Sequence, residues 1–508
     1  MSRSSSRLGT AAAACAVIFG GAAAQDLSAD SFASAPGWMQ DVYAERAYAP
    51  VWSDERGEPS DAFEALVRAI RQAETRGLDT ETYGGERIAR LRSESPAVRE
   101  QGATALFAAY ALDLIEGRTD PEIEYQPNFE QLRDVRRGDL VLDAFRDEQP
   151  LRYLGRVTPD NFLVERLTEA LATYRRYAAE GAWDALPSDD ALIKPGETHE
   201  LVPALRRRLA AEGFEPGRST GETHDDALVD ALKAFQRSRR IKDDGVVGPN
   251  TLAALNETPQ QLVDRLTVNI ERARWLPERL GERAIFVNAA DYTLRLYEGE
   301  KRAVRIPVIV GEEQTQTPIF ADTMETVVVN PYWNVPSSIL IGEIAPKQVR
   351  DPGYVAAKNF EVLVGGEVVP PSSVDWQAAV AGNPSFRVRQ TAGGHNALGR
   401  IKFLFPNKYA VYLHDTPADS LFERDVRTFS HGCIRVKDPV GLGAWILGKS
   451  REDVKAMIDS GERIELPTDE IPVYITYFTA FAEPDGAVTF ARDVYDRDAR
   501  VAKNLAGS

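Results

Sequence analysis

The spacing of apolar residues changes near Glu282 of this 508-residue chain, and that change constrains the fold more than any other feature. Up to about Leu192 the apolar positions recur with the spacing of a helix face. After Glu282 they alternate, as at Ile285 and Val287, which is typical of a half-buried strand. The sequence therefore predicts a multidomain α+β protein, with a helical N-terminal part followed by a β-rich domain.

The helical part divides into two predicted units. Residues 25–194 form a helical scaffold domain, in which Ser60 is placed to cap a helix. Residues 195–258 form a smaller unit, in which Ala234–Gln236 precedes a glycine-containing turn at Asp244–Leu252. These residues resemble the helical peptidoglycan-binding module. The sequence does not separate a module that binds wall polymer from a spacer of the same fold.

The β-rich domain is predicted at residues 282–466, and residues 467–508 are predicted to add C-terminal strands and a tail. Alternation over Tyr409–His414 predicts one of its strands. Helical spacing returns after Pro439, where Ser450 and Asp453 have the pattern of a capping pair. Between the strand-rich ends, residues 344–399 are rich in Pro, Gly and polar side chains. This insertion is long for a simple connection, so we expect a lid or binding loop there.

Residues 1–24 have the order of an export signal: Arg3 and Arg7, then an apolar stretch, then small residues. The apolar stretch is too short to span a bilayer and no other is long enough, so we expect no transmembrane segment in the mature chain. We therefore expect an exported, periplasmic protein. A disordered tail and acylation at Cys15 are the alternatives.

Composition narrows the classes of partner. The chain has 60 Lys and Arg against 77 Asp and Glu, a formal net charge of −17, and no long basic run, so nucleic acid is not expected. Its only cysteines are Cys15 and Cys433, which excludes a disulfide scaffold. Export would leave Cys433 without an intramolecular partner. Such a thiol is reactive, bridged to another molecule, or an inert buried side chain.

Histidines gather around this cysteine in the sequence. His414 and His431 both precede Cys433, and on a strand Tyr412 shares a face with His414. An imidazole can take the thiol proton, and Arg435 would favour the anion, so the pattern predicts a thiolate nucleophile that forms a thioester. The main-chain N–H groups of Gly432 and Cys433, with the Tyr412 hydroxyl, are candidates for stabilising an oxyanion.

Asp415 is the candidate group for fixing the tautomer of His414, through either its main-chain carbonyl or its side chain. Together, Tyr412–Pro417 and Ser430–Val436 resemble the catalytic domain of the L,D-transpeptidase (YkuD) family. Trp333–Ile339 and Asn396–Phe403 resemble its large periplasmic, YcbB-like branch.

The resemblance implies a cysteine acyltransferase that forms 3-3 cross-links between peptidoglycan stem peptides, with no metal and no other cofactor. It implies that Cys433 is the nucleophile, His414 the base, and the main-chain carbonyl of Asp415 the orienting group, where many members have Gly or Ser. It implies that residues 344–399 are a substrate-capping subdomain. Residues that match the oxyanion, substrate-shaping or motif positions are Tyr412, Ser430, His431, Gly432, Arg435, Trp333 and Asn396.

Several alternatives stay open from the residues alone. A zinc ion would accept His414, His431 and Cys433 as ligands, although no carboxylate helper is evident. His431 and Trp333 could serve packing only. A wall-binding scaffold with a structural thiol is the non-catalytic alternative. For an enzyme, the acceptor could be a diaminopimelate amine, water, a free D-amino acid or a protein amine. Cell-wall synthesis proteins are expected partners.

Overall fold

The computed structural model describes residues 27–121, 136–147, 149–158, 161–187, 191–299, 301–483 and 486–507. The chain forms two compact units: Met1–Arg279 with Phe478–Ser508, and Leu280–Tyr477. The predicted export signal and Cys15 lie outside the described residues. Within the ranges given above, no helix combines the length and apolar character that crossing a membrane requires.

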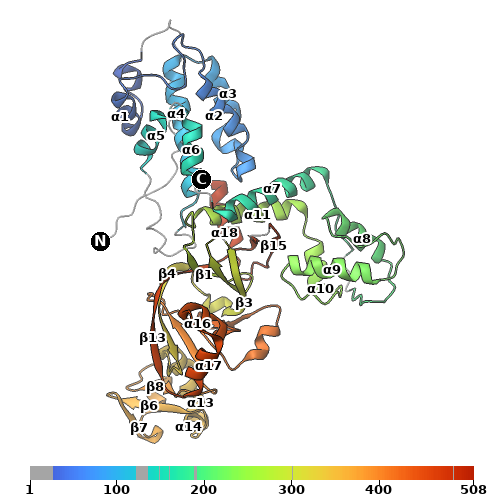
Figure 1. Cartoon of the computed structure of the whole chain (residues 1–508), viewed down its shortest axis with the longest axis vertical. Coiled ribbons are helices and arrows are strands. Elements are labelled where there is room, and N and C mark those ends of the chain that lie inside the picture. The colour runs from blue at the N-terminus through green and yellow to red at the C-terminus, as the bar shows by residue number, and fades with distance from the viewer. Residues whose placement is uncertain are drawn as a thin grey trace. The chain divides into compact units, whose positions relative to one another are not determined.

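The first unit begins with helices packed around one apolar core, which includes Trp52, Phe63 and Phe107. These helices, drawn from blue to cyan in Figure 1, are α1 (Gly37–Glu45), α2 (Asp61–Arg71), α3 (Gly85–Arg90), α4 (Pro96–Glu116), α5 (Arg137–Arg146) and α6 (Pro150–Val157). The Ser60 side chain accepts a hydrogen bond from the Phe63 N–H at the start of α2, as predicted. This cap satisfies a donor that the helix itself leaves unpaired.

The same unit contains the predicted small module. Its helices, green in Figure 1, are α8 (Val202–Ala211), α9 (Asp226–Ser238) and α10 (Pro249–Leu255). Leu205, Leu232 and Phe235 are buried in its core. The Gln236 side chain stabilises the glycine-containing turn. Its amide NH2 donates to the Val246 carbonyl at 3.0 Å, and its amide oxygen accepts from the Gly245 N–H at 2.8 Å. The helical scaffold and helical module predicted from periodicity are confirmed.

Two long helices and the C-terminal residues complete this unit. Helix α7 packs along α11. Their bounds, with those of the C-terminal hairpin and helix, are α7 (Phe162–Glu180), α11 (Pro259–Arg274), β14 (Ala480–Ala482), β15 (Val488–Phe490) and α18 (Asp498–Gly507).

A buried cluster of charged side chains connects the small module to α7 and β15. The Glu212 carboxylate accepts hydrogen bonds from Arg208 at 2.9 Å, from Arg239 and from the Tyr174 hydroxyl at 2.7 Å. The Arg239 guanidinium lies 4.9 Å from the centre of the Phe490 ring. Burial raises the pKa of Glu212, but the charges of Arg239 and Arg208 outweigh it and leave that pKa below its ordinary value. The carboxylate is therefore charged and fully engaged.

Replacing Glu212 by glutamine is expected to destabilise the first unit by about 3–5 kcal/mol, because the buried Arg208 and Arg239 both lose their nearest counter-charge and Arg239 is left with Glu257 at 3.8 Å. Denaturant unfolding, with hydrogen exchange followed over α8 and α9, measures this effect. Asp243→Asn is the matched control, since Asp243 pairs with Arg237 at the surface, where the side chains are 52% and 59% exposed. The control is expected to cost less than about 1 kcal/mol. Equal losses in the two variants would contradict the prediction.

The second unit is built on a nine-stranded sheet in the order β11-β3-β12-β10-β9-β4-β13-β1-β2. A further pairing of β2 with β3 closes the sheet on itself. The strands are β1 (Arg283–Asn288), β2 (Thr293–Glu298), β3 (Lys301–Gly311), β4 (Phe320–Val329), β9 (Ile401–Leu404), β10 (Leu413–His414), β11 (Thr428–Ser430), β12 (Ile434–Val436) and β13 (Ile464–Thr476). The β-rich domain predicted after Glu282 is confirmed.

Helices α16 (Pro439–Leu447) and α17 (Arg451–Asp459) follow β12. Helix α17 begins with the capping pair expected at Ser450 and Asp453, whose side chains each accept the other residue's main-chain N–H. This reciprocal arrangement satisfies two helix-end donors.

The insertion in the second unit is folded rather than a plain loop. Its four-stranded sheet, in the order β5-β8-β6-β7, starts at Trp333, upstream of the expected insertion. The strands are β5 (Trp333–Asn334), β6 (Phe360–Val364), β7 (Glu367–Val369) and β8 (Arg387–Gln390). Val355, Val362 and Trp376 are buried in a core of its own. We call residues 333–399 the capping subdomain.

The strand expected over Tyr409–His414 is mostly wrong. Only Leu413–His414 is a strand. The Asn407 side chain accepts from the N–H groups of Tyr409 and Val411, both at 3.1 Å, and Ala410 has a φ of 54°. These main-chain groups are thus paired within a turn and are not available to a neighbouring strand.

Candidate active site

The register of three neighbouring strands places chemically active side chains on one face. Strand β10 is parallel to β12, with His414 opposite Arg435, and antiparallel to β9, with His414 opposite Lys402. Because side chains alternate along a strand, Tyr412 shares the face of His414, and Cys433 shares the face of Arg435. The sheet thereby brings the predicted nucleophile and base to the same surface.

Cys433 follows a tight turn that polar groups hold in place. Gly432 has a φ of 108°, which favours glycine. The Ser430 hydroxyl donates to the Cys433 carbonyl at 2.5 Å and accepts from the Gly432 N–H at 3.2 Å. The Thr317 hydroxyl donates to the Gly432 carbonyl at 2.9 Å. Since the Gly432 N–H is engaged, the Cys433 N–H and the Tyr412 hydroxyl are the better oxyanion donors.

The Cys433 thiol lies in a partly buried position. The Tyr412 side chain lies beside it, and its sulfur lies 3.8 Å from the Ala410 carbonyl oxygen. Burial raises the pKa of Cys433 above its ordinary value, while Tyr412 and Arg435 lower it by less. Burial also raises the pKa of Tyr412, so its hydroxyl stays a donor. Arg435 therefore acts in the expected direction, but the resting thiol is protonated.

His414 is buried and neutral. Its Nδ1–H donates to the Asp415 main-chain carbonyl at 2.5 Å, which leaves Nε2 as the proton acceptor. Burial, followed by the charges of Arg435 and Lys402, lowers the pKa of His414 to about 3. The Tyr412 and His414 rings lie 5.7 Å apart. At neutral pH the pair is thus a thiol and an imidazole, without charge separation.

We expect alkylation of Cys433 by iodoacetamide to have its pH midpoint above that of an ordinary cysteine, because the thiolate forms only at higher pH. The measurement compares folded and guanidine-unfolded Cys15→Ala chains, in which Cys433 is the sole cysteine. The folded chain should have the higher midpoint. A lower midpoint would indicate a preformed thiolate–imidazolium pair and contradict the prediction.

Asp415 uses its side chain for structure. The carboxylate accepts from the N–H groups of Arg400 and Thr416, both at 2.7 Å. A Cβ added at Gly399 would lie 2.2 Å from this carboxylate, so only glycine fits there. Of the two groups that the sequence left open, the main-chain carbonyl is the one that meets the His414 ring.

His431 connects the turn before Cys433 to the capping subdomain. Its Nε2 lies 3.1 Å from the Glu343 carboxylate, and both side chains are half-exposed. Glu343 belongs to η8 (Leu340–Ile344), one turn of π-helix. Such turns are frequent at functional sites. Glu343 and Thr317 were both missed from the sequence, where nothing local marks them.

The contacts recorded for Trp333 and Asn396 are with the capping subdomain and its connection to the sheet. Trp333 packs on Phe360, with ring centres 6.1 Å apart, inside the capping subdomain. Asn396 is fully buried, and its amide donates to the carbonyls of Pro331 and Thr391, both at 3.0 Å. Both residues shape the subdomain next to the site, and neither has a contact with Cys433 among these interactions.

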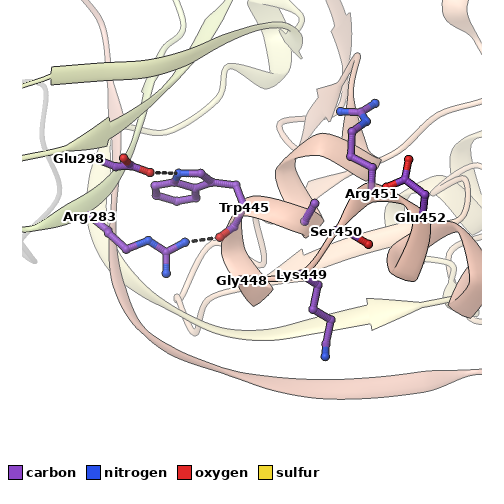
Figure 2. A pocket seen from close by; sticks show the side chains of 9 residues that line it. Arg283, Glu298, Trp445, Gly448, Lys449, Ser450, Arg451 and Glu452 are labelled. Atoms are coloured by element: carbon purple, nitrogen blue, oxygen red, sulfur yellow. Dashed lines mark hydrogen bonds between the residues drawn. The ribbon is translucent and has the colours of Figure 1, made fainter.

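A separate hollow of about 680 Å³ lies where β1 and β2 meet the ends of α16 and α17. Figure 2 shows the Trp445 indole N–H donating to Glu298, at 3.0 Å, and the Arg283 guanidinium beside the same ring. Arg451 is bound to Asp438 at 2.7 Å. These polar groups already satisfy one another, and neither Cys433 nor His414 lines the hollow. This hollow is therefore separate from the candidate active site at Cys433 and His414.

Zinc ligation was an alternative for these side chains, although the sequence predicted no metal. In the part of the chain that the structure describes, no three His, Cys, Asp or Glu residues are grouped to hold a metal ion. His414 Nδ1 is already bonded to a carbonyl.

Known protein families match three regions. Residues 282–465 match the L,D-transpeptidase catalytic domain, residues 37–171 a scaffold domain, and residues 198–255 a domain described as "Putative peptidoglycan binding domain". A Haemophilus influenzae protein described as "Putative L,D-transpeptidase" is 35% identical over 250 residues, covering 48% of this chain and 50% of that relative. The chain thus spans half the length of this curated relative. The recognised catalytic domain and module are confirmed.

Two solved structures were also found, both L,D-transpeptidases. One, from Xylanimonas cellulosilytica, is 16% identical, with 57% of this chain and 100% of that chain covered and a TM-score of 0.17. The other, from Stackebrandtia nassauensis, is 14% identical, with 58% and 96% covered and a TM-score of 0.22. TM-scores this low do not establish a shared overall architecture.

Proposed function

We propose that the L,D-transpeptidase catalytic domain at residues 282–465 is a cysteine acyltransferase that forms 3-3 cross-links between peptidoglycan stem peptides. The observation that supports this most is the shared sheet face of Cys433 and a neutral His414. Because Nδ1 of this histidine is bonded to Asp415, Nε2 is left to take the thiol proton.

In the first half-reaction, Nε2 of His414 accepts the proton of Cys433 as the sulfur attacks a donor tetrapeptide. The attacked atom is the carbonyl carbon at the L-centre of diaminopimelate. The carbonyl oxygen takes up negative charge and is held by the Tyr412 hydroxyl and the Cys433 N–H. The C–N bond to the terminal D-alanine then breaks, His414 returns the proton to the leaving amine, and a thioester remains.

In the second half-reaction, the neutral side-chain amine of another stem attacks the thioester carbon. A C–N bond forms, the C–S bond breaks, and the amine proton passes through His414 to the sulfur. Water, a free D-amino acid or a protein amine would use the same steps, so the acceptor distinguishes a cross-linking enzyme from its alternatives.

The remaining parts of the chain are consistent with a wall polymer as substrate. The match at residues 198–255 is to a domain of the peptidoglycan-binding type. We propose that this module binds the polymer, that the export signal takes the protein to the periplasm, and that cell-wall synthesis proteins are its partners there.

The test is to incubate the purified full chain with disaccharide-tetrapeptide and to analyse protein and products by mass spectrometry. The proposal expects a thioester on Cys433 and a cross-linked dimer that has lost one D-alanine. A thioester that yields only tripeptide would make water the acceptor. Absence of both thioester and dimer, in a folded chain with a free thiol, would support the non-catalytic scaffold.

A further inference from the structure

Lys402 lies beside the candidate active site but takes no part in the steps above. It stands on β9 directly opposite His414 of β10, and Arg435 stands opposite His414 on the other side. The three residues form a row across neighbouring strands, on the face that also carries Tyr412 and Cys433. A neutral imidazole is thus flanked by two cations.

The Lys402 ammonium has no carboxylate within ion-pair distance among the described residues. Glu465 attracts it, but Glu465 is itself paired with Arg463, whose charge repels the ammonium. Lys402 is half-buried, and this burial, followed by the charge of Arg463, lowers its pKa. A cation that is withdrawn from water without a partner is costly, and an anion brought by a ligand would remove that cost.

The position of the ammonium relative to the thiol suggests which anion this is. Lys402 Nζ lies 6.0 Å from the centre of the Tyr412 ring, and this tyrosine lies beside Cys433. In a donor tetrapeptide, the terminal carboxylate lies roughly 4 Å from the attacked carbon. A charge-assisted hydrogen bond adds about 3 Å. Both lengths are short, so this carboxylate needs a cation on the same sheet face as the thiol, and the strand register places Lys402 there.

We infer that Lys402 binds the C-terminal carboxylate of the donor tetrapeptide and thereby positions the scissile bond at Cys433. This inference rests on the proposed function and makes Lys402 a specificity residue for donors that end in a free carboxylate. The flanking Arg435 is held by the protein, since its guanidinium donates to the Phe429 carbonyl at 3.1 Å. Lys402 has no such hydrogen bond among the described residues, so its ammonium is the cation of the row whose donors are all open to a substrate anion.

The experiment compares disaccharide-tetrapeptide with the same compound carrying a C-terminal carboxamide, and follows thioester formation on the full chain by intact mass. In the unsubstituted protein, amidation is expected to lower kcat/KM for acylation by about 10- to 100-fold. Lys402→Met should lower kcat/KM for the carboxylate substrate by about the same factor, and it should not lower kcat/KM for the carboxamide substrate any further. Lys402→Arg should keep most of the preference. Amidating only the second carboxylate of diaminopimelate should leave this preference unchanged.

Lys449→Met is the matched control, an exposed lysine in the hollow of Figure 2, and should behave as the unsubstituted protein. Equal losses on both substrates in Lys402→Met would overturn the inference. If the Lys402→Met variant folds poorly, the unsubstituted protein alone still tests the inference. Equal acylation rates with the carboxylate substrate and the carboxamide substrate would also overturn the inference. Acylation by neither substrate would instead count against the proposed function.

Discussion

Replacing Cys433 by alanine is expected to abolish thioester formation and to reduce cross-linked product by about 10⁴-fold or more, because the proposed acyl-enzyme forms on its sulfur and a thioester needs that atom. The position of the sulfur explains the size of the effect. It shares a sheet face with His414, and the turn that carries it is held by Ser430 and Thr317. Intact mass and product analysis with disaccharide-tetrapeptide measure the loss.

Cys15→Ala is the control for this substitution, since it removes the other cysteine and should leave acylation unchanged. Product formation by the Cys433→Ala chain at a rate near that of the control would show that another residue is the nucleophile. Inactivity of both chains, together with the unsubstituted protein, would point to the wall-binding scaffold.

Replacing His414 by glutamine is expected to slow acylation by about 10³- to 10⁴-fold, because the amide cannot accept a proton. The pH dependence should change as well. In the unsubstituted protein the imidazole is a competent base down to a pH near its pKa of about 3, so acylation should show no acid limb near pH 6.5. In the variant only preformed thiolate reacts, and the raised pKa of Cys433 makes the rate climb steadily with pH through the neutral range.

Thioester formation measured from pH 5 to 10 tests both statements. His395→Gln is the matched control, an exposed histidine whose Nε2 contacts the Thr391 hydroxyl at 3.2 Å, and it should leave the rate and its pH dependence unchanged. A His414→Gln chain with the pH profile of the unsubstituted protein would remove this residue from the role of base.

Local sequence patterns predicted the elements whose stabilising contacts are themselves local. The caps at Ser60 and Ser450 depend on residues within one helical turn, and both are present. The alternation at Ile285 and Val287 correctly predicted a strand, β1. The pattern is local, because in a strand every second side chain lies on the same face.

Strand boundaries and sheet order were harder to predict, because pairing partners lie far apart in the chain. Strand β13 lies between β4 and β1, although it follows them by a long stretch of sequence. A local contact also shortened one strand. The Asn407 side chain accepts hydrogen bonds from the N–H groups of Tyr409 and Val411, so the strand before His414 is shorter than the alternation of apolar residues predicted. The capping subdomain likewise gains its strands from pairings that periodicity does not reveal.

The amino-acid sequence by itself determined the succession of helical and β-rich parts and the motif that joins a histidine to a cysteine, since both are properties of neighbouring residues. Only the tertiary structure decided that Lys402 faces His414, that Glu343 meets His431, and that the Cys433 thiol is protonated at rest. Strand register creates the first of these contacts, and packing of the capping subdomain creates the second. The protonation state depends on burial, which outweighs the nearby charge of Arg435 and exists only once the chain has folded.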